Sequence, residues 1–439
     1  MIAIPRCGRD DTLRRPSPVA RPPSPAASRQ PPPPSVTVAE SYVRLVLAVG
    51  QHDADYVDAY YGPAEWKSEA EGVQLPLPEI EQRARTLIAE LGEQPDTPDM
   101  PAARRTFLCR QLEALVARVQ MLQNTRFSFD EEARALYDVT PPLNTERHFQ
   151  DIVSRLDSAL PGRGSVPERY VSYRHRFVIP AARVDAVFQA AIAAGRDRTA
   201  GHIPLPPNES FVVEYVTDKP WSGYNWYQGS YRSVIQVNTG LPIYIDRAVD
   251  LACHEGYPGH HVYNALLEQT LVRGRRWLEF TVYPLFSPQS LIAEGSANYG
   301  IELALPGAER NAFERDVLFP LAGLPTSTVD EYYGVQALVR ELSYAGNEAA
   351  RRYLDGEIDA ATAVDWLERY ALMAPPVARQ RIRFFEKYRS YVINYNLGQD
   401  LVRAYVERAA GPSEDQRWAV FAELLSSPLL PSSLSGDSA

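Results

Sequence analysis

The spacing of hydrophobic and polar positions divides the chain into two helical regions separated by one β-rich segment. In both helical regions apolar residues recur every three to four positions, which is the period of a helix with one buried face. The predicted helices cover 42–49, 79–93, 101–123, 128–137, 145–160 and 180–195, and then 246–272, 290–303, 328–353, 357–371, 376–408 and 415–425. The pattern therefore predicts a mainly α fold.

The segment 205–245 has a different composition. Its runs 211–216 and 230–238 are rich in β-branched and aromatic residues, and Gly223 and Gly229 lie between them. This composition is typical of strands interrupted by turns. We expect a hairpin or part of a small sheet, placed beside the helix that follows it.

The N-terminal residues 1–36 contain ten prolines and six arginines. Such a segment buries too little apolar surface to offset the entropy lost on ordering. The sequence thus predicts a disordered tail over 1–37, an N-terminal helical region over 38–200, and a third region over 201–430 that carries the candidate chemistry.

The overall composition excludes some classes of protein. Of the 439 residues, 45% are hydrophobic and 23% charged, as in an ordinary globular protein, and the net charge of −10 disfavours a nucleic-acid partner. Three scattered cysteines do not form a disulfide framework, and no segment resembles a signal peptide or a membrane span. We predict a cytoplasmic protein with no membrane partner, unless a different start codon adds an export signal. The oligomeric state is left open.

Residues 254–261 read H-E-G-Y-P-G-H-H and hold three of the seven histidines. Imidazole and carboxylate groups are zinc ligands, and zinc peptidases use an adjacent His-Glu pair in which histidine binds the metal and glutamate takes a proton from water. The pattern predicts His254 as a ligand and Glu255 as a general base. Cys253 follows two apolar residues, and we expect it to be buried rather than a ligand.

The spacing of this motif departs from the usual one, in which the second histidine lies four residues after the first. Pro258 occupies that position here, and proline disrupts a continuing helix. The helix must kink, bulge or restart, and Pro258 could begin the new helix. His260 would then be the second ligand. His261 is the alternative, and otherwise we expect it to contact substrate or support the ligands.

The stretch 293–299 suggests a third ligand. On a helix, Glu294 shares one stripe with Leu291, Ala297 and Ile301. A carboxylate on a buried stripe is unfavourable unless it is paired or binds a metal. A salt bridge to an arginine is the structural alternative, but the His-Glu pair forty residues upstream favours ligation.

The two motifs, H-E-G-Y-P-G-H-H and E-G-S-A-N-Y, together resemble the bacterial family named domain of unknown function 885. The second motif is also similar to the helix that carries the third zinc ligand in gluzincin aminopeptidases. Segments 53–63, 237–242 and 388–398 extend the resemblance over about 38–410. Ser296 replaces a tryptophan that is more frequent in the family, which changes a pocket wall but no ligand.

This resemblance implies a zincin-like helical metallopeptidase with Zn²⁺ bound by His254, His260 and Glu294. It also points to Tyr395, within a Tyr-Asn-Leu-Gly motif, as a hydroxyl that stabilises the oxyanion. An aromatic stripe is more often part of a core, so a core role is favoured for most of the tyrosines of 388–395. Arg403 is expected in a surface salt bridge rather than on a substrate carboxylate.

Strand 230–238 could bind an extended peptide along an exposed edge, with Asn238 beside the cleft. The alternative is a purely structural hairpin. Three hypotheses for the whole chain follow: a zinc peptidase, which we favour; a zinc hydrolase of a non-peptide amide or ester; and a helical binding protein whose histidines are structural.

Overall fold

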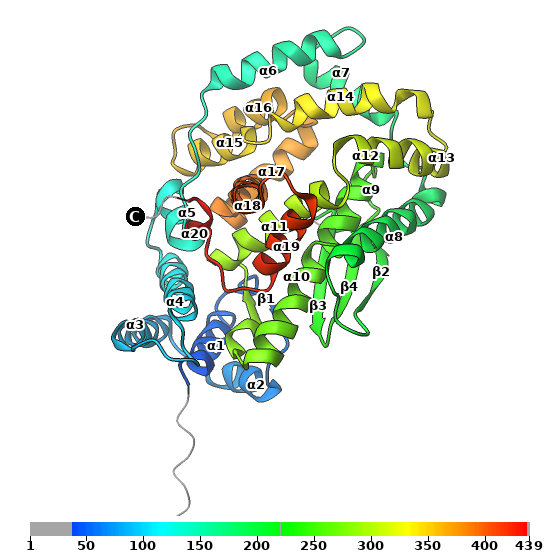
Figure 1. Cartoon of the computed structure of the whole chain (residues 1–439). Coiled ribbons are helices and arrows are strands. Elements are labelled where there is room, and N and C mark those ends of the chain that lie inside the picture. Colours follow the sequence, from blue (N-terminus) through cyan, green and yellow to red (C-terminus); the bar gives the residue numbers. More distant parts are fainter. Residues whose placement is uncertain (1–36, 220, 437–439) are drawn as a thin grey trace, which may run out of the picture. The chain divides into compact units, whose positions relative to one another are not determined.

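The computed structural model describes residues 37–219 and 221–436. Residues from Thr37 onward belong to one compact unit, so the predicted regions 38–200 and 201–430 lie within the same unit. The predicted disordered tail falls outside the described residues, apart from Thr37. The mainly α fold with a small β-sheet is confirmed: helices dominate, with one two-stranded and one three-stranded sheet in the described residues (Figure 1).

The first half of the unit is helical, as predicted. Its helices are α1 (Val38–Val49), α2 (Ala64–Val73), α3 (Leu77–Glu93), α4 (Ala102–Leu122), α5 (Phe129–Tyr137), α6 (Glu146–Ala159), α7 (Val166–His175) and α8 (Val184–His202). The pattern missed α7, although Ser165 and Glu168 form a capping box at its start and Pro167 lies in its first turn. These are start signals that the sequence displays. The short helix α2 was not predicted either.

The three-stranded sheet comprises β2 (Ser210–Val216), β3 (Gly223–Gly229) and β4 (Arg232–Asn238), in the order β2-β4-β3. Of the two alternatives predicted for 211–216 and 230–238, part of a small sheet is confirmed, and a hairpin between them is not, because β2 and β4 run parallel. The hairpin joins β3 to β4 instead. Its two turn residues, Ser230 and Tyr231, both have positive φ, as a tight hairpin turn requires. Neither is a typical turn glycine or asparagine, so the sequence signal was weak.

A second sheet pairs β1 (Val57–Tyr60) with β5 (Val282–Pro284), antiparallel, across more than two hundred residues of sequence. Both strands are too short to be recognised from alternation alone. Their pairing places Asp58 near His260, which lies about two hundred residues further along the chain.

The predicted helix 246–272 is interrupted at its motif. It consists of α9 (Ile245–Leu251), a π-helical turn η2 (Ala252–Gly256), α10 (His260–Leu267) and a second π-helical segment η3 (Glu268–Gly274). The expected break at Pro258 is present, and the Tyr257–Pro258 peptide bond is cis. Pro258 is not the first residue of the new helix, however, because α10 begins at His260.

Helix α11 (Pro288–Ala304) is buried around most of its circumference and crosses α18 (Ile393–Ala410) at close range. The two helices lie side by side near the centre of Figure 1. A Cβ atom added to Gly398 would lie 2.7 Å from the Leu291 carbonyl oxygen and 3.0 Å from Gly295 Cα. Glycine at both positions therefore permits the close approach of the two backbones.

The remaining C-terminal helices are α12 (Gly307–Phe313), α13 (Phe319–Ala322), α14 (Val329–Arg340), α15 (Ala345–Leu354), α16 (Ala360–Tyr370), α17 (Pro375–Tyr388), α19 (Glu414–Leu425) and α20 (Pro431–Leu434). Short 3₁₀ turns are η1 (Ala181–Arg183), η4 (Leu278–Thr281), η6 (Thr326–Thr328) and η7 (Arg389–Val392), and η5 (Glu314–Leu318) is π-helical.

Two predicted long helices are each divided in the structure. The range 328–353 is α14 and α15, separated by a turn, and the range 376–408 is α17 and α18, separated by η7. The second break occurs at Arg389, whose φ of 51° is incompatible with a continuing helix. Within the described ranges, no helix has both the length and the apolar character needed to cross a membrane.

Candidate metal centre

Three backbone elements bring the predicted ligands together. The π-helical turn η2 carries His254 and Glu255, the first residue of α10 is His260, and the middle of α11 carries Glu294. A π-bulge is a common device for re-aiming a side chain at a functional site. Here the break after η2 places two histidines of one motif face to face, with ring centroids 4.6 Å apart.

The three potential ligand atoms have the mutual spacing of a zinc site. His254 Nε2 lies 3.1 Å from His260 Nε2, and Glu294 Oε2 lies 3.2 Å from the first and 3.8 Å from the second. Zinc–ligand bonds of 2.0–2.1 Å in a tetrahedron place neighbouring ligand atoms about 3.3 Å apart. Glu294 Oε2 is also buried without a hydrogen bond of acceptable geometry to the described residues. These residues therefore fit a zinc ion.

Asn298, one helical turn after Glu294, fixes the orientation of the His254 ring by contacting its Nδ1. The Asn298 amide donates from Nδ2 to the Tyr395 carbonyl oxygen at 2.8 Å, so its Oδ1 faces His254 Nδ1 at 2.9 Å. An amide oxygen only accepts, so Nδ1 of His254 must carry the proton. Nε2 then presents its lone pair toward His260 and Glu294, as metal ligation requires.

The Glu294 carboxylate is held ionised within the protein. Its Oε1 accepts a hydrogen bond from the Tyr391 hydroxyl at 2.7 Å. Burial disfavours the charge, but the adjacent imidazoles of His254 and His260 outweigh it and hold the pKa of Glu294 well below its usual range. A buried carboxylate that stays charged is suited to binding a cation.

Glu255 has the opposite electrostatic environment. Its carboxyl lies within 4.8 Å of the ring nitrogens of His254 and His260. Burial, together with the charge of Glu294, raises the pKa of Glu255 to about 7 although His260 opposes the shift. Two carboxyls of one site whose pKa values are pushed apart are typical of separate ligand and acid–base roles.

Strand β3 lies against Glu255. Asn225 donates from Nδ2 to the Glu255 carbonyl oxygen at 2.7 Å, and this fixes the backbone of η2. A Cβ atom on Gly223 would lie 3.0 Å from Glu255 Oε1. The lack of a side chain at this position thus leaves room for the carboxyl, a reason for glycine that the strand pattern did not reveal.

His261, the alternative ligand, lies in a different environment. Its Nδ1 is 2.9 Å from Ser233 Oγ and its Nε2 is 2.9 Å from Glu209 Oε2, so both ring nitrogens are engaged. This serine–histidine–glutamate arrangement resembles a nucleophilic triad, but the serine is 3% exposed and the histidine 0% exposed. Substrate cannot reach a nucleophile buried in this way. The cluster ties β4 and the loop before β2 to α10, which supports the element that carries His260.

Asn238 and the strand that carries it do not form the predicted peptide-binding edge. Strand β4 is the central strand of its sheet, with both edges paired, so the edge-strand prediction for 230–238 is wrong. Asn238 donates from Nδ2 to the carbonyl oxygens of Lys219 and Trp221 at 2.9 and 3.0 Å. It organises the loop between β2 and β3, and β3 is the edge strand beside Glu255.

The predicted tyrosine stripe is divided by the break before η7. Tyr388 ends α17, Tyr391 lies in η7 and Tyr395 lies in α18. Tyr391 is the tyrosine that contacts Glu294, while the Tyr395 hydroxyl makes no hydrogen bond to the described residues. Burial and the Glu294 charge raise the pKa of Tyr395 well above 10, so this hydroxyl stays protonated and can donate.

Two further predictions concern residues outside the centre. Arg403 pairs with Glu302 at 2.8 Å and with Asp400 at 2.9 Å, the surface salt bridge that was expected. Cys253 is 0% exposed, as expected for an apolar packing residue, and burial raises the pKa of its thiol to about 12.

Several residues of the centre escaped sequence reasoning. Asn298 could have been found, because it lies four positions after Glu294 on the same helical face. Asp58 could not, since it comes from β1 and accepts a hydrogen bond from the Tyr224 hydroxyl of β3. Burial raises the pKa of Asp58 to about 6, and both His260 and Glu294 lie close enough to influence it.

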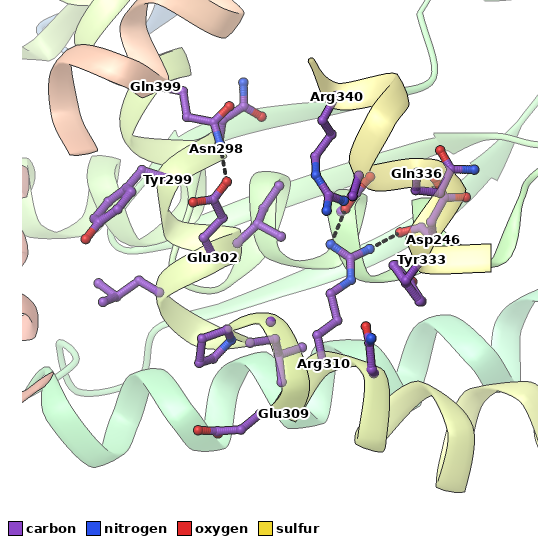
Figure 2. Close-up of a pocket in the computed structure, with 18 of the residues that line it drawn as sticks. Asp246, Asn298, Tyr299, Glu302, Glu309, Arg310, Tyr333, Gln336, Arg340 and Gln399 are labelled. Atoms are coloured by element: carbon purple, nitrogen blue, oxygen red, sulfur yellow. Dashed lines mark hydrogen bonds and ion pairs between the residues drawn. The ribbon is translucent and has the colours of Figure 1, made fainter. Parts of the chain in front are cut away.

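A large polar cavity of about 940 Å³ lies behind the centre, lined by Asn298 but by none of the four predicted metal-site residues. Figure 2 shows its charged residues engaged with one another. Arg310 donates to the Asp246 carbonyl oxygen at 2.9 Å, and Gln399 donates to Glu302 at 2.9 Å. The cavity therefore reaches Asn298, which supports His254, but it does not open onto the predicted ligands.

Comparisons with known proteins show a fold and no activity. No family model and no curated protein matches the chain. A crystal structure of a candidate lipoprotein from Colwellia psychrerythraea is similar, with a TM-score of 0.51 and 17% identity over 91% of this chain and 75% of that one. A candidate lipoprotein of unknown function from Shewanella oneidensis gives 0.45 and 12%, over 84% and 74%. The resemblance to domain of unknown function 885 therefore stays a prediction.

Proposed function

We propose that this chain is a zinc-dependent peptidase. The observation that carries the proposal is the convergence of His254 Nε2, His260 Nε2 and Glu294 Oε2 at separations of 3.1, 3.2 and 3.8 Å. The carboxyl of Glu255, whose pKa is near neutral, lies beside this set. A structural zinc site has four protein ligands and needs no base. Three ligands with an adjacent base favour hydrolysis.

The residues of the chain divide the work between binding and proton transfer. His254, His260 and Glu294 would hold zinc, which when bound polarises a carbonyl group and activates water. Glu255 accepts a proton from the attacking water and returns it to the leaving amine, a role suited to a carboxyl that titrates near neutral pH. The Tyr395 hydroxyl donates a hydrogen bond to the oxygen on which negative charge develops.

Metal content and turnover test the two parts of this proposal separately. Wild-type protein, purified without added metal, is expected to contain about one zinc per chain, and His254→Ala and Glu294→Ala are expected to lose it. Glu302→Ala is the matched control, since Glu302 lies on the same helix but pairs with Arg403 on the surface. Glu302→Ala should retain the metal.

Glu255→Gln separates the base from the ligands. This variant is expected to keep zinc but to lose hydrolysis of a peptide library by roughly 10²-fold or more. Full turnover in Glu255→Gln would contradict the assignment of the base. A wild-type chain that neither contains nor takes up zinc would contradict the proposal as a whole and favour the binding-protein hypothesis.

The compartment is a separate question. The cytoplasm is the proposed location, because the cysteines are few and scattered, whereas the two structural neighbours are described as lipoproteins. Fractionation of the source cells decides between the cytoplasm and the envelope.

A further inference from the structure

The outer face of the three-stranded sheet carries a row of aromatic side chains. Alternate residues of a strand point to opposite faces, and Asn225 of β3 points inward, where it contacts the Glu255 carbonyl oxygen. Tyr224 and Trp226 therefore point outward. The ring centroid of Tyr224 lies 4.5 Å from that of Trp226 and 5.6 Å from that of Trp221, in the preceding loop. We call Trp221, Tyr224 and Trp226 the aromatic stripe.

The exposed apolar surface continues from the aromatic stripe across the sheet. Trp226 is 45% exposed, more than any other of the six tryptophans. In the strand register it faces Val234, which in turn faces Val212 of β2, 58% exposed. Contiguous exposed apolar groups on a soluble protein commonly mark a binding site, whereas single ones need no explanation. Cross-strand packing accounts for contact between the rings but not for their exposure.

One end of the aromatic stripe lies at the candidate metal centre. β3 is an edge strand, and it lies beside α10 (Figure 1). A Cβ atom on Gly223 would lie 3.0 Å from Glu255 Oε1. The next residue, Tyr224, donates a hydrogen bond to Asp58, which lies outside the sheet on β1. The Glu255 carboxyl and the aromatic stripe are therefore connected along one strand.

The rise of the strand sets the distance between them. At about 3.3 Å per residue, Trp226 lies about 10 Å from Gly223 along β3. An extended peptide has the same rise, so a peptide whose cleaved bond is held at Glu255 reaches the stripe with a side chain two or three residues from that bond.

An aromatic side chain is the group that this surface favours, because rings bury a large apolar area and pack edge-to-face or offset on other rings. We propose that the aromatic stripe binds an aromatic side chain of the peptide substrate, two or three residues from the cleaved bond. This inference rests on the proposed peptidase function. A second copy of the chain is the competing occupant, but the stripe and its two valines are few compared with the roughly 20–30 residues per side of a stable interface.

A set of free-ended hexapeptides tests the proposal on the zinc-loaded full chain. The peptides consist of glycine and serine with a single phenylalanine at each position in turn, and their mates carry serine at the same position. Mass spectrometry of the products locates the cleaved bond. The kcat/KM should be highest, by roughly 10-fold over the serine mates, where phenylalanine stands two or three residues from that bond. A rate that does not depend on the place of phenylalanine would overturn the inference.

Two variants and a control show whether the stripe is responsible. Trp226→Ala should abolish the preference for the phenylalanine peptides, and Trp226→Phe should keep part of it. Tyr215→Ala is the matched control and should keep the whole preference: Tyr215 belongs to the same sheet and is 38% exposed, but its ring packs against Phe188 of α8. If the stripe only stabilises the sheet, Trp226→Ala lowers the Tm and weakens both peptide sets alike, so that the preference survives and the inference fails.

A binding measurement keeps this inference separate from the peptidase proposal. Calorimetry of the Glu255→Gln chain with the same peptides measures recognition without turnover. Tighter binding of the phenylalanine peptides that Trp226→Ala removes supports the inference, even if no peptide is hydrolysed and the peptidase proposal fails. Equal binding of both sets overturns it. A change of oligomeric state in Trp226→Ala with an unchanged preference also overturns it, and assigns the surface to contact between two copies of the chain.

Discussion

Removal of the Asn298 side chain should weaken zinc binding without touching a ligand. Asn298→Ala deletes the acceptor that faces His254 Nδ1 at 2.9 Å and the donor that faces the Tyr395 carbonyl oxygen at 2.8 Å. His254 then loses the contact that fixes both its ring orientation and its tautomer. The variant therefore measures the contribution of the Asn298 amide to zinc binding, because all three predicted ligands, including Glu294 and His260, are unchanged.

The expected magnitude follows from these two contacts. Loss of a hydrogen-bond partner behind a metal-bound histidine lowers metal affinity by about 10- to 100-fold, or about 1.4–2.7 kcal/mol. The cavity that Asn298 lines lets water replace part of the lost contact, so we expect the lower half of that range. The metal-free protein should be less stable by about 1–2 kcal/mol, since each hydrogen bond contributes about 1 kcal/mol.

Competition with a chromogenic chelator gives the zinc Kd, and urea unfolding of the metal-free protein gives its stability. Asn298→Asp is the informative partner: its carboxylate keeps an acceptor for His254 but cannot donate to Tyr395. Zinc affinity should then be retained while the metal-free protein is destabilised. An unchanged Kd in Asn298→Ala, or an Asn298→Asp chain that binds zinc as weakly as Asn298→Ala, would refute the reasoning.

Three further predictions test the surroundings of the centre. Tyr391→Phe leaves Glu294 Oε1 without its donor at 2.7 Å, so chelator competition should show zinc affinity lower by about 10-fold, and an unchanged affinity would contradict this. Gly398→Ala should lower stability in urea by about 1–3 kcal/mol, because its Cβ would meet the Leu291 carbonyl oxygen at 2.7 Å, whereas Gly334→Ala, with open space around it, should raise stability by about 0.5–1 kcal/mol. Burial opposes the charge of Glu209, but hydrogen bonds from His261, Tyr257 and Arg196 lower its pKa to about 2, below that of the unfolded chain. The stabilisation is therefore fully present above about pH 4.5 and is lost as the pH falls toward 2, so Glu209→Gln should cost about 2 kcal/mol at pH 7, allowing for the exposed Arg196, and progressively less in acid. An equal loss of stability in Glu209→Gln at pH 7 and in acid would mean that the packing of Glu209, and not its charge, is responsible.

Local patterns in the sequence were sufficient for the class of the fold and for the chemical types in the candidate site. The mainly α class followed from helical periodicity, which is a local property of each segment. The same periodicity placed Glu294 on a buried stripe, where the structure has it 7% exposed. The chemical types of the residues were enough to predict His254, Glu255 and His260 as site residues, and these side chains do lie together.

Pairings between distant segments could not be predicted from local sequence patterns. The parallel β2–β4 pair and the β1–β5 pair depend on contacts between distant segments. Local patterns therefore left the pairing of the first open between a hairpin and a small sheet, and predicted nothing for the second. The break at Arg389 likewise escaped a pattern that continues through it, and Tyr391, in the turn that follows this break, donates to Glu294.

The choice between His260 and His261 shows what the sequence determines and what only the tertiary structure decides. The sequence determined that a histidine after the Pro258 break would face His254, because proline ends the helix and the residue types are those of a zinc site. Which histidine it is was decided by Ser233 and Glu209, which come from β4 and from the loop before β2 and engage both nitrogens of His261. Orientation of a side chain depends on the partners that surround it, and those partners are assembled only when the chain folds.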